Sequence, residues 1–505
     1  MTEDHGARQE DGAGAVLVVR AEELRAARRV LVAREVSLSA AAGDVVAVEG
    51  PNGSGKSTLL AAAAGLLPTG RSGGRRPASV GYAPERADVL PRLAVRRWLT
   101  GLARTAGLSR AEAAGQADDL LARVGLAGSG HRPLRALSRG NVQRALVAQA
   151  LVGPPELVVL DEPSGGLDRD GLGRVTAEIQ RAAGRSSVVL VARHPTAPLP
   201  LPAGPAWRIG DGAVRAEERA ADEVPLVEVE IGDGPARHVT ESELPAILRA
   251  ALDAGQPVRR VQALDRECGG EAAAAATAGP APRRAGAVSR IVHGAAYRAR
   301  LLAVSQWFAA PALLLLIVLG IVYGGQAGPL LPAAAFVAAV LIPVVTWVTV
   351  LAHLADGRLM ARAFAAHVGG RGRAHLAACL AGVPFGVAAT VAAVAWSAFS
   401  QPFPSHQPGL LLQMAVLDLA AAALGIGVAA LLVPPLVERA GWRVCLGAAL
   451  FLALLLIRFS PARPLLLLAT HHGAGWGTVG ATAGLLAGSG AVLVAASTVA
   501  AIRLP

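Results

Sequence analysis

The stretch from Gly50 to Thr58 reads Gly-Pro-Asn-Gly-Ser-Gly-Lys-Ser-Thr, and it decides the fold of the first part of this 505-residue chain. Its glycine spacing before Lys-Ser matches a loop that cradles the phosphates of a nucleotide. The apolar run Val45–Val48 before it predicts a buried strand, and an Ala/Leu-rich helix is expected from about Lys56 to Leu67. Strand, loop and helix in this order predict an α/β fold and favour it over a chance glycine-rich turn.

Lys56 is the only lysine in the sequence, and the other 47 of the 48 Lys and Arg residues are arginines. A compact ammonium group on a flexible stem can reach the β- and γ-phosphates inside a tight backbone cradle. The planar guanidinium of arginine is too large for that place. Glycines let backbone N–H groups turn toward the phosphate oxygens, and the positive end of the following helix points the same way. The Ser57 hydroxyl is expected to bind Mg²⁺.

The composition divides the chain into a charged part and an apolar part. The mean hydropathy is +0.45 and 53% of the residues are hydrophobic, which is too apolar for a wholly soluble protein. Residues 1–300 carry most of the charge, and residues 301–505 carry little. The formal net charge of +11 comes from arginines that are dispersed or flank apolar segments. This pattern favours contact with an anionic membrane surface over nucleic acid.

Three smaller features concern targeting, redox state and metals. Met1–Gly14 is acidic and polar without an apolar core, so no secretory signal is predicted there. The adjacent histidines at 471 and 472 have no third ligand near them in sequence, so a metal site there is not favoured. The cysteines have neither metal nor disulfide spacing and are interpreted as small buried hydrophobic residues in a reducing compartment. They are Cys268, Cys379 and Cys445.

Five further motifs follow the loop in a fixed order. A short strand leads to a glutamate, an N-capping serine opens a helix, and an apolar strand ends in two carboxylates. A Gly-Leu-Asp turn and another apolar strand with a histidine after it complete the set. These segments are Val80–Glu85, Leu137–Arg144 with Ser138 and Gly140, Leu157–Leu160 with Asp161 and Glu162, Gly166–Asp168, and Val188–Ala192 with His194.

The polar residues of these motifs predict nucleotide chemistry. Asp161 can hold Mg²⁺ through water, and Glu162 beside it can polarise an attacking water molecule. His194 lies just past a strand end, where a histidine can contact a γ-phosphate. Gly140 permits close approach of the backbone to an anion.

Together and in this order, the motifs resemble the nucleotide-binding domain of ATP-binding cassette (ABC) transporters over about Val16 to Val214. On that resemblance Gly50–Thr58 is the Walker A loop, Leu157–Glu162 is Walker B and Leu137–Asn141 is the signature loop. The resemblance implies an α/β P-loop NTPase that binds ATP and Mg²⁺, in which two cassettes sandwich two ATP molecules. Each ATP would lie between Walker A of one subunit and the signature loop of the other.

The resemblance also implies roles for individual residues. The implied catalytic residues are Glu162, His194 and Lys56, and the implied metal ligands are Ser57, Glu85 and Asp161. The implied nucleotide-binding residues are Gly50, Asn52, Gly53, Ser54, Gly55, Lys56, Ser57, Thr58, Glu85, Ser138, Gly140, Asp161 and Asp168.

Three positions depart from the family pattern. The family's Q-loop glutamine is Glu85 here, which can still bind Mg²⁺ but adds negative charge beside the phosphates, and a slow, degenerate site is the alternative. The signature loop reads Leu-Ser-Arg-Gly-Asn, and its Arg139 resembles a variant of drug-export-like cassettes. The aromatic residue that stacks on adenine in the family is missing from Arg25–Arg28. Either an arginine stacks there instead, or nucleotide affinity is weak.

The chain continues past the cassette, which is predicted over residues 15–215. Residues 223–265 predict a small α+β, βαβ-like extension with strands at Leu226–Ile231 and Val258–Leu264 and a helix over Glu241–Ala254. The Ala/Gly/Pro-rich residues 266–288 are interpreted as a flexible linker. Residues 289–306 predict an amphipathic connecting helix along the inner membrane surface, or the cytosolic start of the first span.

Residues 307–505 predict an all-α transmembrane permease domain of about six helices. The arginine-bearing loops are expected on the cytoplasmic side, with the cassette and both termini. Asp418, an acid inside a span, is either functional or held by a neighbouring hydroxyl. The predicted spans are Trp307–Tyr323, Leu331–Leu354, His375–Phe399, Leu410–Val437, Val444–Ile457 and Val479–Ile502, and Pro464–Ala469 is expected as a re-entrant or surface helix.

This organisation resembles type V (ABC type-2) exporters. It implies ATP-driven export of a hydrophobic or amphipathic solute, such as a drug, lipid, peptide or natural product, across the cytoplasmic membrane. The implied partners are a second half-transporter, the lipid bilayer and the exported solute. Three alternatives stay open: the weakly hydrolysing half of a heterodimer, an ATP-dependent regulatory or mechanotransmitting membrane protein, and a catalytically poor cassette that serves for dimerisation.

Overall fold

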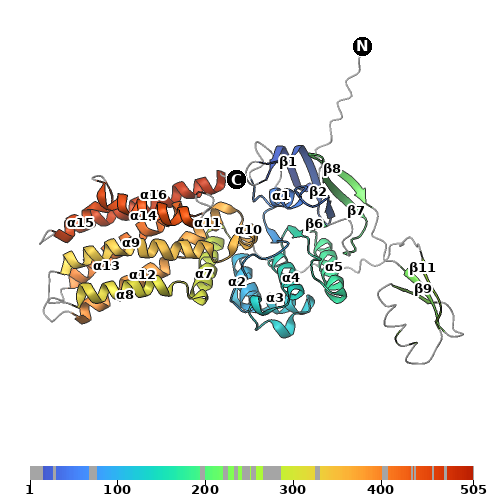
Figure 1. Ribbon diagram of the computed structural model, residues 1–505, viewed down its shortest axis with the longest axis horizontal. Helices are drawn as coiled ribbons and strands as arrows, with labels where there is room; N and C mark the ends of the chain where they lie inside the picture. Colours follow the sequence, from blue (N-terminus) through green and yellow to red (C-terminus); the bar gives the residue numbers. More distant parts are fainter. Residues whose placement is uncertain are drawn as a thin grey trace, which may run out of the picture.

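The computed structural model places a mixed α/β part beside an elongated bundle of helices, with α7 and α10 at the junction (Figure 1). The α/β part corresponds to the predicted cassette, and the helical bundle corresponds to the predicted permease. The described residues are 15–26, 30–67, 77–193, 199–219, 226–231, 237–240, 249, 251, 258–264, 286–324, 330–400, 408–433, 436, 440–457, 460–470 and 475–503.

The α/β part is built on a sheet of six described strands in the order β4-β5-β6-β3-β7-β8. Neighbouring strands run parallel except β7 and β8, which form an antiparallel hairpin at one edge. β3, β5 and β6 are buried along their whole length, as expected for parallel strands covered on both faces. The strands are β3 (Val45–Glu49), β4 (Val80–Ala83), β5 (Leu157–Asp161), β6 (Val188–Arg193), β7 (Gly204–Gly210) and β8 (Ala213–Arg219).

Helices and a separate hairpin surround this sheet. Gly107, with φ of +101°, lies just after the helix that ends at Thr105, whereas Gly115 lies inside the continuous helix Arg110–Arg123. The helix after the phosphate loop ends at Ala63, before the predicted Leu67. The elements are the antiparallel hairpin β1 (Ala15–Arg25) and β2 (Leu31–Ala41), and the helices α1 (Lys56–Ala63), α2 (Val95–Thr105), α3 (Arg110–Arg123), α4 (Arg139–Ala150) and α5 (Arg169–Gly184).

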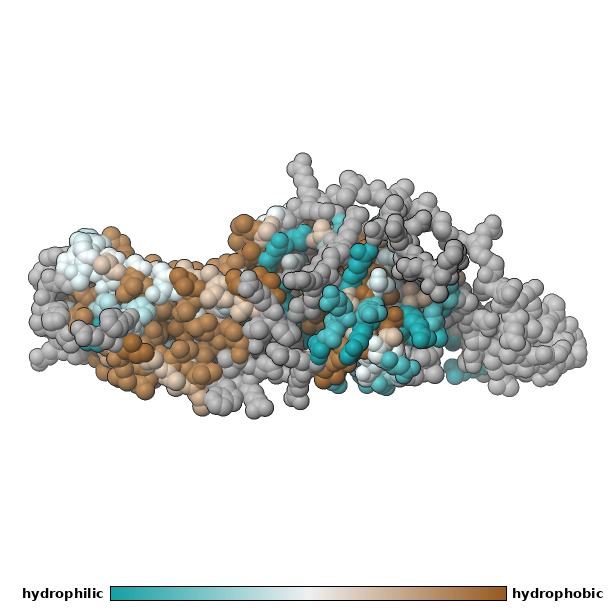
Figure 2. Space-filling model, turned by 90° about the horizontal axis from the view of Figure 1, so that it is seen from above, coloured by the Kyte–Doolittle hydropathy of each residue, from teal (hydrophilic) through white to brown (hydrophobic). Residues whose placement is uncertain are grey.

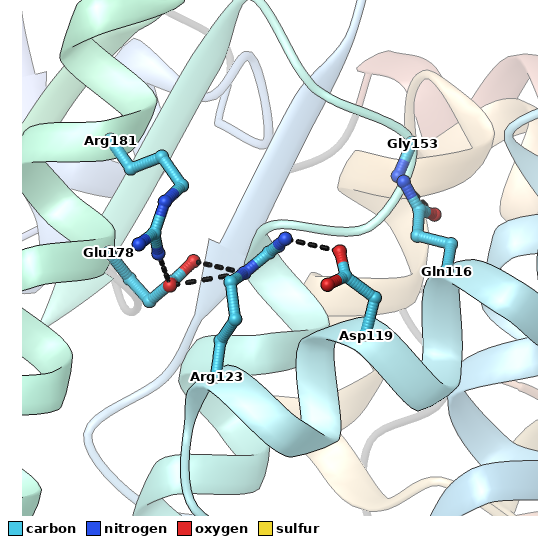
Figure 3. A network of polar contacts seen from close by, with 6 residues as sticks. All are labelled: Gln116, Asp119, Arg123, Gly153, Glu178 and Arg181. Atoms are coloured by element: carbon cyan, nitrogen blue, oxygen red, sulfur yellow. Dashed lines mark hydrogen bonds and ion pairs between the residues drawn. The ribbon is translucent and has the colours of Figure 1, made fainter. Parts of the chain in front are cut away.

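A buried carboxylate ties α3 to α5 (Figure 3). Glu178 of α5 is 3% exposed, and its two oxygens accept from Arg123 of α3 at 3.1 and 3.2 Å and from Arg181 one turn further along α5. Arg123 also pairs with Asp119 on its own helix. Because α3 belongs to the helical segment between the two Walker motifs, this contact fixes that segment to the core of the cassette.

Replacing Arg123 with alanine is expected to lower the free energy of unfolding by about 1–3 kcal/mol, because the buried Glu178 loses a charged hydrogen-bond donor. The measurement is the thermal midpoint of the solubilised full-length protein. The control is Arg110→Ala on the exposed first turn of the same helix, which should leave the midpoint unchanged. Equal midpoints for both variants would contradict the role given to Arg123.

Past the cassette, three described strands form a small antiparallel sheet in the order β10-β9-β11. The two predicted strands are present as β9 (Leu226–Ile231) and β11 (Val258–Leu264). They pair directly and antiparallel, rather than in the parallel sense of a βαβ unit. β10 (Arg237–Thr240) was not predicted. Most of the predicted helix over 241–254, and the linker up to residue 285, lie outside the described residues.

Four helices in the described part of the chain are long and apolar enough to cross a membrane, or up to five if one bent pair counts as a span. The bent pair is α7 and α8, which meet at 79°. Two predicted spans, Trp307–Tyr323 and Val444–Ile457, correspond to helices that are shorter than these four. They are α8 (Ala309–Tyr323), with 15 residues, and α14 (Ala440–Leu456), with 17. The four long ones are α9 (Leu330–Leu354), α11 and α12 together (Arg371–Ser400), α13 (Pro408–Leu431) and α16 (Trp476–Arg503).

The remaining helices complete the connections. α7 (Ala287–Ser305) is the predicted connecting helix, and α15 (Arg463–Thr470) is the predicted short helix. The arginine-bearing segment 358–373 forms α10 (Gly357–Val368) and the start of α11 (Arg371–Leu380), which continues as α12 (Val383–Ser400). α10 packs against β4 of the cassette, so this segment lies at the cassette end of the bundle.

The face of the bundle seen in Figure 2 is mostly brown and apolar, with paler residues at the end far from the α/β part, whereas teal, hydrophilic residues gather on the α/β part. Large apolar side chains stand exposed along α8, among them Leu313, Ile317 and Ile321. An apolar surface of this extent is what contact with lipid requires. Asp418 of α13 lies inside the bundle at 1% exposure, and its Oδ1 atom has no hydrogen-bond partner among the described residues. No hydroxyl of the described residues therefore holds that oxygen.

Candidate functional site

A cleft of about 1330 Å³ lies over the phosphate loop between β3 and α1. The loop forms its floor at the carboxyl end of β3, where β6 and β7 flank the strand. The predicted residues in its lining are Gly50, Asn52, Gly53, Ser54, Gly55, Lys56, Ser57, Thr58, Glu85 and Glu162. Walker A, the Q-loop position and the Walker B glutamate therefore meet in one place.

Two glycines leave no room for a side chain in the loop. A Cβ atom on Gly50 would lie 2.4 Å from the Ile209 carbonyl oxygen. A Cβ atom on Gly55 would lie 2.2 Å from Val32 Cγ1, and its φ of +103° is itself unfavourable for other residues. The tight loop exposes backbone N–H groups in the way that a phosphate cradle needs. The buried Ser54 hydroxyl, without a hydrogen-bond partner among the described residues, faces the same cradle.

Lys56 is held inside the loop that it is expected to serve. Its Nζ atom donates to the carbonyl oxygens of Gly50 at 2.9 Å and Pro51 at 3.2 Å, and the side chain is only 5% exposed. The Glu162 carboxylate lies 3.6 Å from the same ammonium group. A phosphate group entering the cradle would find the ammonium already placed at its rim.

Asp161 at the end of β5 has the properties of a metal-binding carboxylate. It is 5% exposed, and its Oδ1 atom has no hydrogen-bond partner in the part of the chain that is described. Its pKa is raised to about 6, chiefly because the carboxyl is buried; the hydrogen bond from the Ser57 hydroxyl opposes that rise, and the charges of Glu162 and Glu85 add to it. A buried carboxylate oxygen without a partner, beside a hydroxyl and a second carboxylate, fits the oxygen ligands that Mg²⁺ prefers.

Glu162 occupies a backbone conformation that is rare for its residue type, with φ of +48°. Its N–H donates to the Ala192 carbonyl oxygen at 3.1 Å, and its own carbonyl accepts from Gln143 Nε2 at 3.4 Å. These contacts to β6 and α4 hold the turn, so the side chain points toward Lys56 and stays 35% exposed to the cleft. The carboxylate is placed where it can accept a proton from a water molecule above the phosphate loop.

Glu85 follows β4 and lines the same cleft. Its charge contributes to the raised pKa of Asp161, which places the two carboxylates close enough to influence one another. The departure from the family glutamine therefore adds a negative charge close to Asp161.

Replacing Glu85 with glutamine is expected to leave the ATPase active and to tighten apparent Mg·ATP binding by up to about fivefold. Removing one unit charge at several ångströms is worth on the order of 1 kcal/mol against a nucleotide phosphate. The measurement is ATPase rate against nucleotide concentration, with the exposed Glu22→Gln as the matched control. A complete loss of hydrolysis would show that Glu85 has acquired a role of its own.

The signature residues lie outside this cleft. Ser138 caps α4, where its hydroxyl accepts from Asn141 N–H at 3.3 Å, and Asp168 caps α5 by accepting from Gly171 N–H at 2.8 Å. Gly140 packs closely against the backbone at Gly166, so a Cβ atom on Gly140 would lie 2.6 Å from the Gly166 carbonyl oxygen. Within one chain, none of these three residues joins Lys56 in the described lining of the cleft.

His194 lies outside the described residues. The residue before it, Arg193, forms an ion pair with Glu49 at 2.9 Å, and both side chains are 8% exposed. Glu49 and Arg208 also line the cleft, and neither was predicted from the sequence. Glu49 ends β3 directly before the phosphate loop but lies outside its glycine-lysine motif. Arg208 reaches the cleft because β7 pairs with β3, where Arg208 lies opposite Glu49, 159 residues away in sequence.

The β1–β2 hairpin contributes small and aliphatic residues to the lining of the cleft. Ala26, Val30 and Val32 line it from the β1–β2 hairpin, and Arg208 and Asp211 line it from β7 and the turn after it. No aromatic side chain is among the lining residues that the structure describes. The missing aromatic was expected from the sequence, and Arg208 is the described arginine in the lining.

Comparison with known proteins places the site in a family. A family model described as ABC transporter matches residues 33–165. The zinc import ATP-binding protein ZnuC of Cereibacter sphaeroides is 40% identical over 168 residues, covering 32% of this chain and 65% of that protein. The Fe(3+) ions import ATP-binding protein FbpC of Streptomyces coelicolor is 40% identical over 172 residues, covering 32% and 49%.

A protein named for export is also similar to part of this chain. The "Probable export ATP-binding/permease protein" of Pseudomonas fluorescens is 34% identical over 222 residues, covering 39% of this chain and 33% of that protein. This chain thus spans less than two thirds of the length of each of these three relatives.

Solved structures that resemble this chain cover 40% of it. The ATP-binding subunit of an ABC transporter gives a TM-score of 0.36 at 22% identity, covering 40% of this chain and 90% of that one. CbiO1 from Clostridium perfringens, part of the cbiONQ complex, gives 0.34 at 23%, covering 40% and 87%. The match over residues 33–165, on the loop and sheet described above, identifies the N-terminal part of this chain as an ABC transporter ATP-binding cassette, a domain family that hydrolyses ATP.

Proposed function

We propose that this chain is one half of an ATP-driven membrane exporter, in which hydrolysis of Mg·ATP in the cleft drives rearrangement of the helical bundle. The observation that carries the proposal is a contact surface between the cassette and the bundle, in which α7 and α10 lie against α2, β4 and α4 (Figure 1). A cassette fused to its permease needs such a surface to pass on the movement of its nucleotide site.

The first half of this surface joins α7 to α2. Trp98 Nε1 donates to the Tyr297 hydroxyl at 3.0 Å, and both side chains are buried. Gly101 leaves room for the Tyr297 ring, since a Cβ there would lie 2.8 Å from it. Arg104 donates to His293 Nε2 at 2.8 Å. Large buried side chains from two separate parts of the sequence therefore interlock, which favours joint movement of α2 and α7.

The second half leads from α10 to the nucleotide site. His367 Nε2 lies 2.9 Å from the Gln149 carbonyl oxygen, and Gln149 Nε2 donates to the Tyr82 carbonyl oxygen at 2.8 Å. The Tyr82 hydroxyl points at Asp161 Oδ2 in a long contact of 3.5 Å. A continuous series of polar contacts thus joins the Asp161 carboxylate to α10 through β4 and α4. Glu85 follows β4 directly in sequence.

The chemistry proposed for the cleft follows from its residues. Lys56 would bind the terminal phosphates, and Glu162 would accept the proton of the attacking water. When bound, Mg²⁺ neutralises charge on the phosphates, and Ser57 and Asp161 would hold it with Glu85 beside them. Because Ser138 and Gly140 lie outside the cleft, we propose that a second half-transporter supplies its own signature loop to each ATP.

A buried ion pair braces the contact surface. Arg298 of α7 lies 3.1 Å from Asp356 before α10, with exposures of 4% and 2%, and its guanidinium stacks 4.4 Å over the Phe364 ring. Burial raises the pKa of Asp356, and the charge of Arg298 opposes that rise. Breaking a buried pair by removing one partner leaves a charge without compensation.

Arg298→Ala is therefore expected to destabilise the protein by about 3–5 kcal/mol near neutral pH. Without Arg298 the pKa of Asp356 rises further. The stability lost through the substitution is therefore expected to become smaller as the pH falls and the Asp356 carboxyl becomes neutral. The measurement is the thermal midpoint at about pH 7.5 and about pH 5, with the exposed Arg300→Ala on the same helix as control. A loss that does not change with pH would contradict the assignment to Asp356.

Export, a membrane location and a hydrophobic or amphipathic solute complete the proposal. The apolar surface of the bundle supports the membrane location, and the export ATP-binding/permease relative supports the direction, although the ZnuC and FbpC relatives are named for import. The arginine-bearing segment at the cassette end supports a cytoplasmic cassette.

Proteoliposomes with the cassette facing outward test the proposal. With Mg·ATP outside, export predicts accumulation of an amphipathic cationic dye or a fluorescent phospholipid in the lumen or inner leaflet, and Glu162→Gln should abolish it. Release of preloaded probe would indicate import and overturn the direction. ATP hydrolysis with movement of neither probe would favour a regulatory protein that uses ATP without transport.

A further inference from the structure

A cluster of two histidines and a cysteine lies inside the helical bundle, away from the nucleotide site. His353 comes from the end of α9, and His375 and Cys379 come from one face of α11, four residues apart. Cys379 Sγ lies 3.8 Å from His353 Nε2 and 3.7 Å from His375 Nε2. The three ligand atoms all lie within 4.8 Å of one another.

These distances match those across a metal ion. Metal–sulfur bonds of about 2.3 Å and metal–nitrogen bonds of about 2.0–2.1 Å hold sulfur and nitrogen about 3.5–3.8 Å apart at tetrahedral to trigonal angles. The positions of the three ligand atoms therefore already suit one ion. A buried cysteine that only fills space would not need two imidazole nitrogens within 3.8 Å of its sulfur.

One histidine is already oriented as a ligand. His353 Nδ1 lies 2.9 Å from the Thr349 carbonyl oxygen, which can only accept, so the proton sits on Nδ1 and the Nε2 lone pair faces Cys379. His375 Nε2 donates to Ser497 Oγ of α16 at 2.9 Å, because the serine proton already goes to the Val494 carbonyl. Binding would require His375 to move its proton to Nδ1 and free Nε2.

Burial and charge suit a soft cation. Cys379 is 1% exposed and His375 is 6% exposed, among apolar residues that include Val345 and Ile426. Arg298 lies close, but its charge is balanced by Asp356 at 3.1 Å. Thiolate and imidazole ligands in a dry site select Zn²⁺ or Cu⁺ over the hard cations Mg²⁺ and Ca²⁺.

We propose that His353, His375 and Cys379 bind one thiophilic d¹⁰ cation, Zn²⁺ or Cu⁺. On binding, the Cys379 thiol releases its proton to solvent, and the thiolate sulfur and two Nε2 lone pairs form the metal bonds, with no change in oxidation state. The ion would join α9 to α11. Arg298 of α7 donates to the carbonyl oxygens of Ala352 and His353 at 3.0 and 3.4 Å, so the site adjoins the surface that meets the cassette.

The test uses the full-length chain in detergent with Cys268 and Cys445 replaced by serine, so that Cys379 is the sole thiol. After chelation, Co²⁺ is titrated as a probe. A thiolate-to-cobalt charge-transfer band at one ion per chain is expected, and Zn²⁺ should displace it. A parallel titration with Cu⁺ against a chromogenic chelator measures the second ion, and the tighter of the two identifies the preferred cation.

Cys379→Ser and His353→Gln are each expected to weaken binding at least about tenfold. The matched control carries Cys445 as its sole thiol and should show no band. Binding should also raise the thermal midpoint of the parent but not of Cys379→Ser, whose metal-free midpoint should stay close to that of the parent and show that it folds. Equal cobalt binding in Cys379→Ser, or none of the three ions bound by the folded parent, would overturn the proposal.

Discussion

Glu162→Gln is expected to lower ATP turnover by about 10²–10⁴-fold, the range that a general base contributes. Glutamine has the same shape, so the φ of +48° at this turn and the backbone bonds to Ala192 and Gln143 should persist. ATP binding should remain, because Lys56 and the loop are unchanged. Steady-state hydrolysis and equilibrium nucleotide binding on the same preparation separate the two effects.

The same variant should trap a closed pair of cassettes. Cysteines placed at Ser138 of one chain and Ser54 of the other should crosslink more with ATP, once Cys268, Cys379 and Cys445 are replaced by serine. Glu22→Gln is the control for the substitution itself and should hydrolyse ATP normally. If Glu162→Gln stays monomeric at saturating Mg·ATP and no partner chain restores crosslinking, the two-cassette arrangement is wrong for this protein.

Lys56→Ala is expected to lower ATPase activity by at least about 10²-fold, because no other side-chain ammonium exists in the sequence to face the phosphates. Its 5% exposure and its bonds to Gly50 and Pro51 are local, so the helical bundle should remain folded. The thermal midpoint and turnover are measured together, and unaltered turnover would refute the role assigned to the loop.

Lys56→Arg tests why a lysine stands there. It keeps the charge but replaces a point-like group with a planar fork in a cradle where Gly50 and Gly55 have no spare room. We expect it to lose nearly as much activity as Lys56→Ala. Wild-type activity in Lys56→Arg would show that charge alone is required.

The nucleotide site was predictable to the extent that its parts are local in sequence. The phosphate loop carries its strand and helix within about 20 residues, and Asp161 and Glu162 follow their strand directly. The cleft walls were not predictable. Arg208 reaches the cleft through the pairing of β7 with β3, and Val32 reaches it because the β1–β2 hairpin packs beside the loop, which no local motif signals. The roles of Ser138, Gly140, Asp168 and His194 remain predictions.

In the helical bundle, apolarity predicted helices but not their lengths. Trp307–Tyr323 was predicted to span, yet the 79° bend after α7 leaves α8 with 15 residues, and no local residue pattern signals that bend. From their spacing, all three cysteines were interpreted as small buried hydrophobic residues. Cys445 is exposed, which corrects that interpretation, and Cys379 is buried as predicted but beside two histidines. The sequence alone could have placed only His375 and Cys379 together, because they lie four residues apart on one helix. His353 comes close to them only because α9 packs against α11.

The placement of Lys56 gives this protein a chemical reporter that needs no engineering. An amine-reactive reagent has a single side-chain target in this sequence, and that target lies in the nucleotide cleft. Bonded to two carbonyl oxygens and nearly buried, the amine should label slowly when the cradle is empty and more slowly still under a bound phosphate. The mass of the intact chain then counts empty and filled sites molecule by molecule, even in a mixed assembly where only one of two cassettes holds ATP.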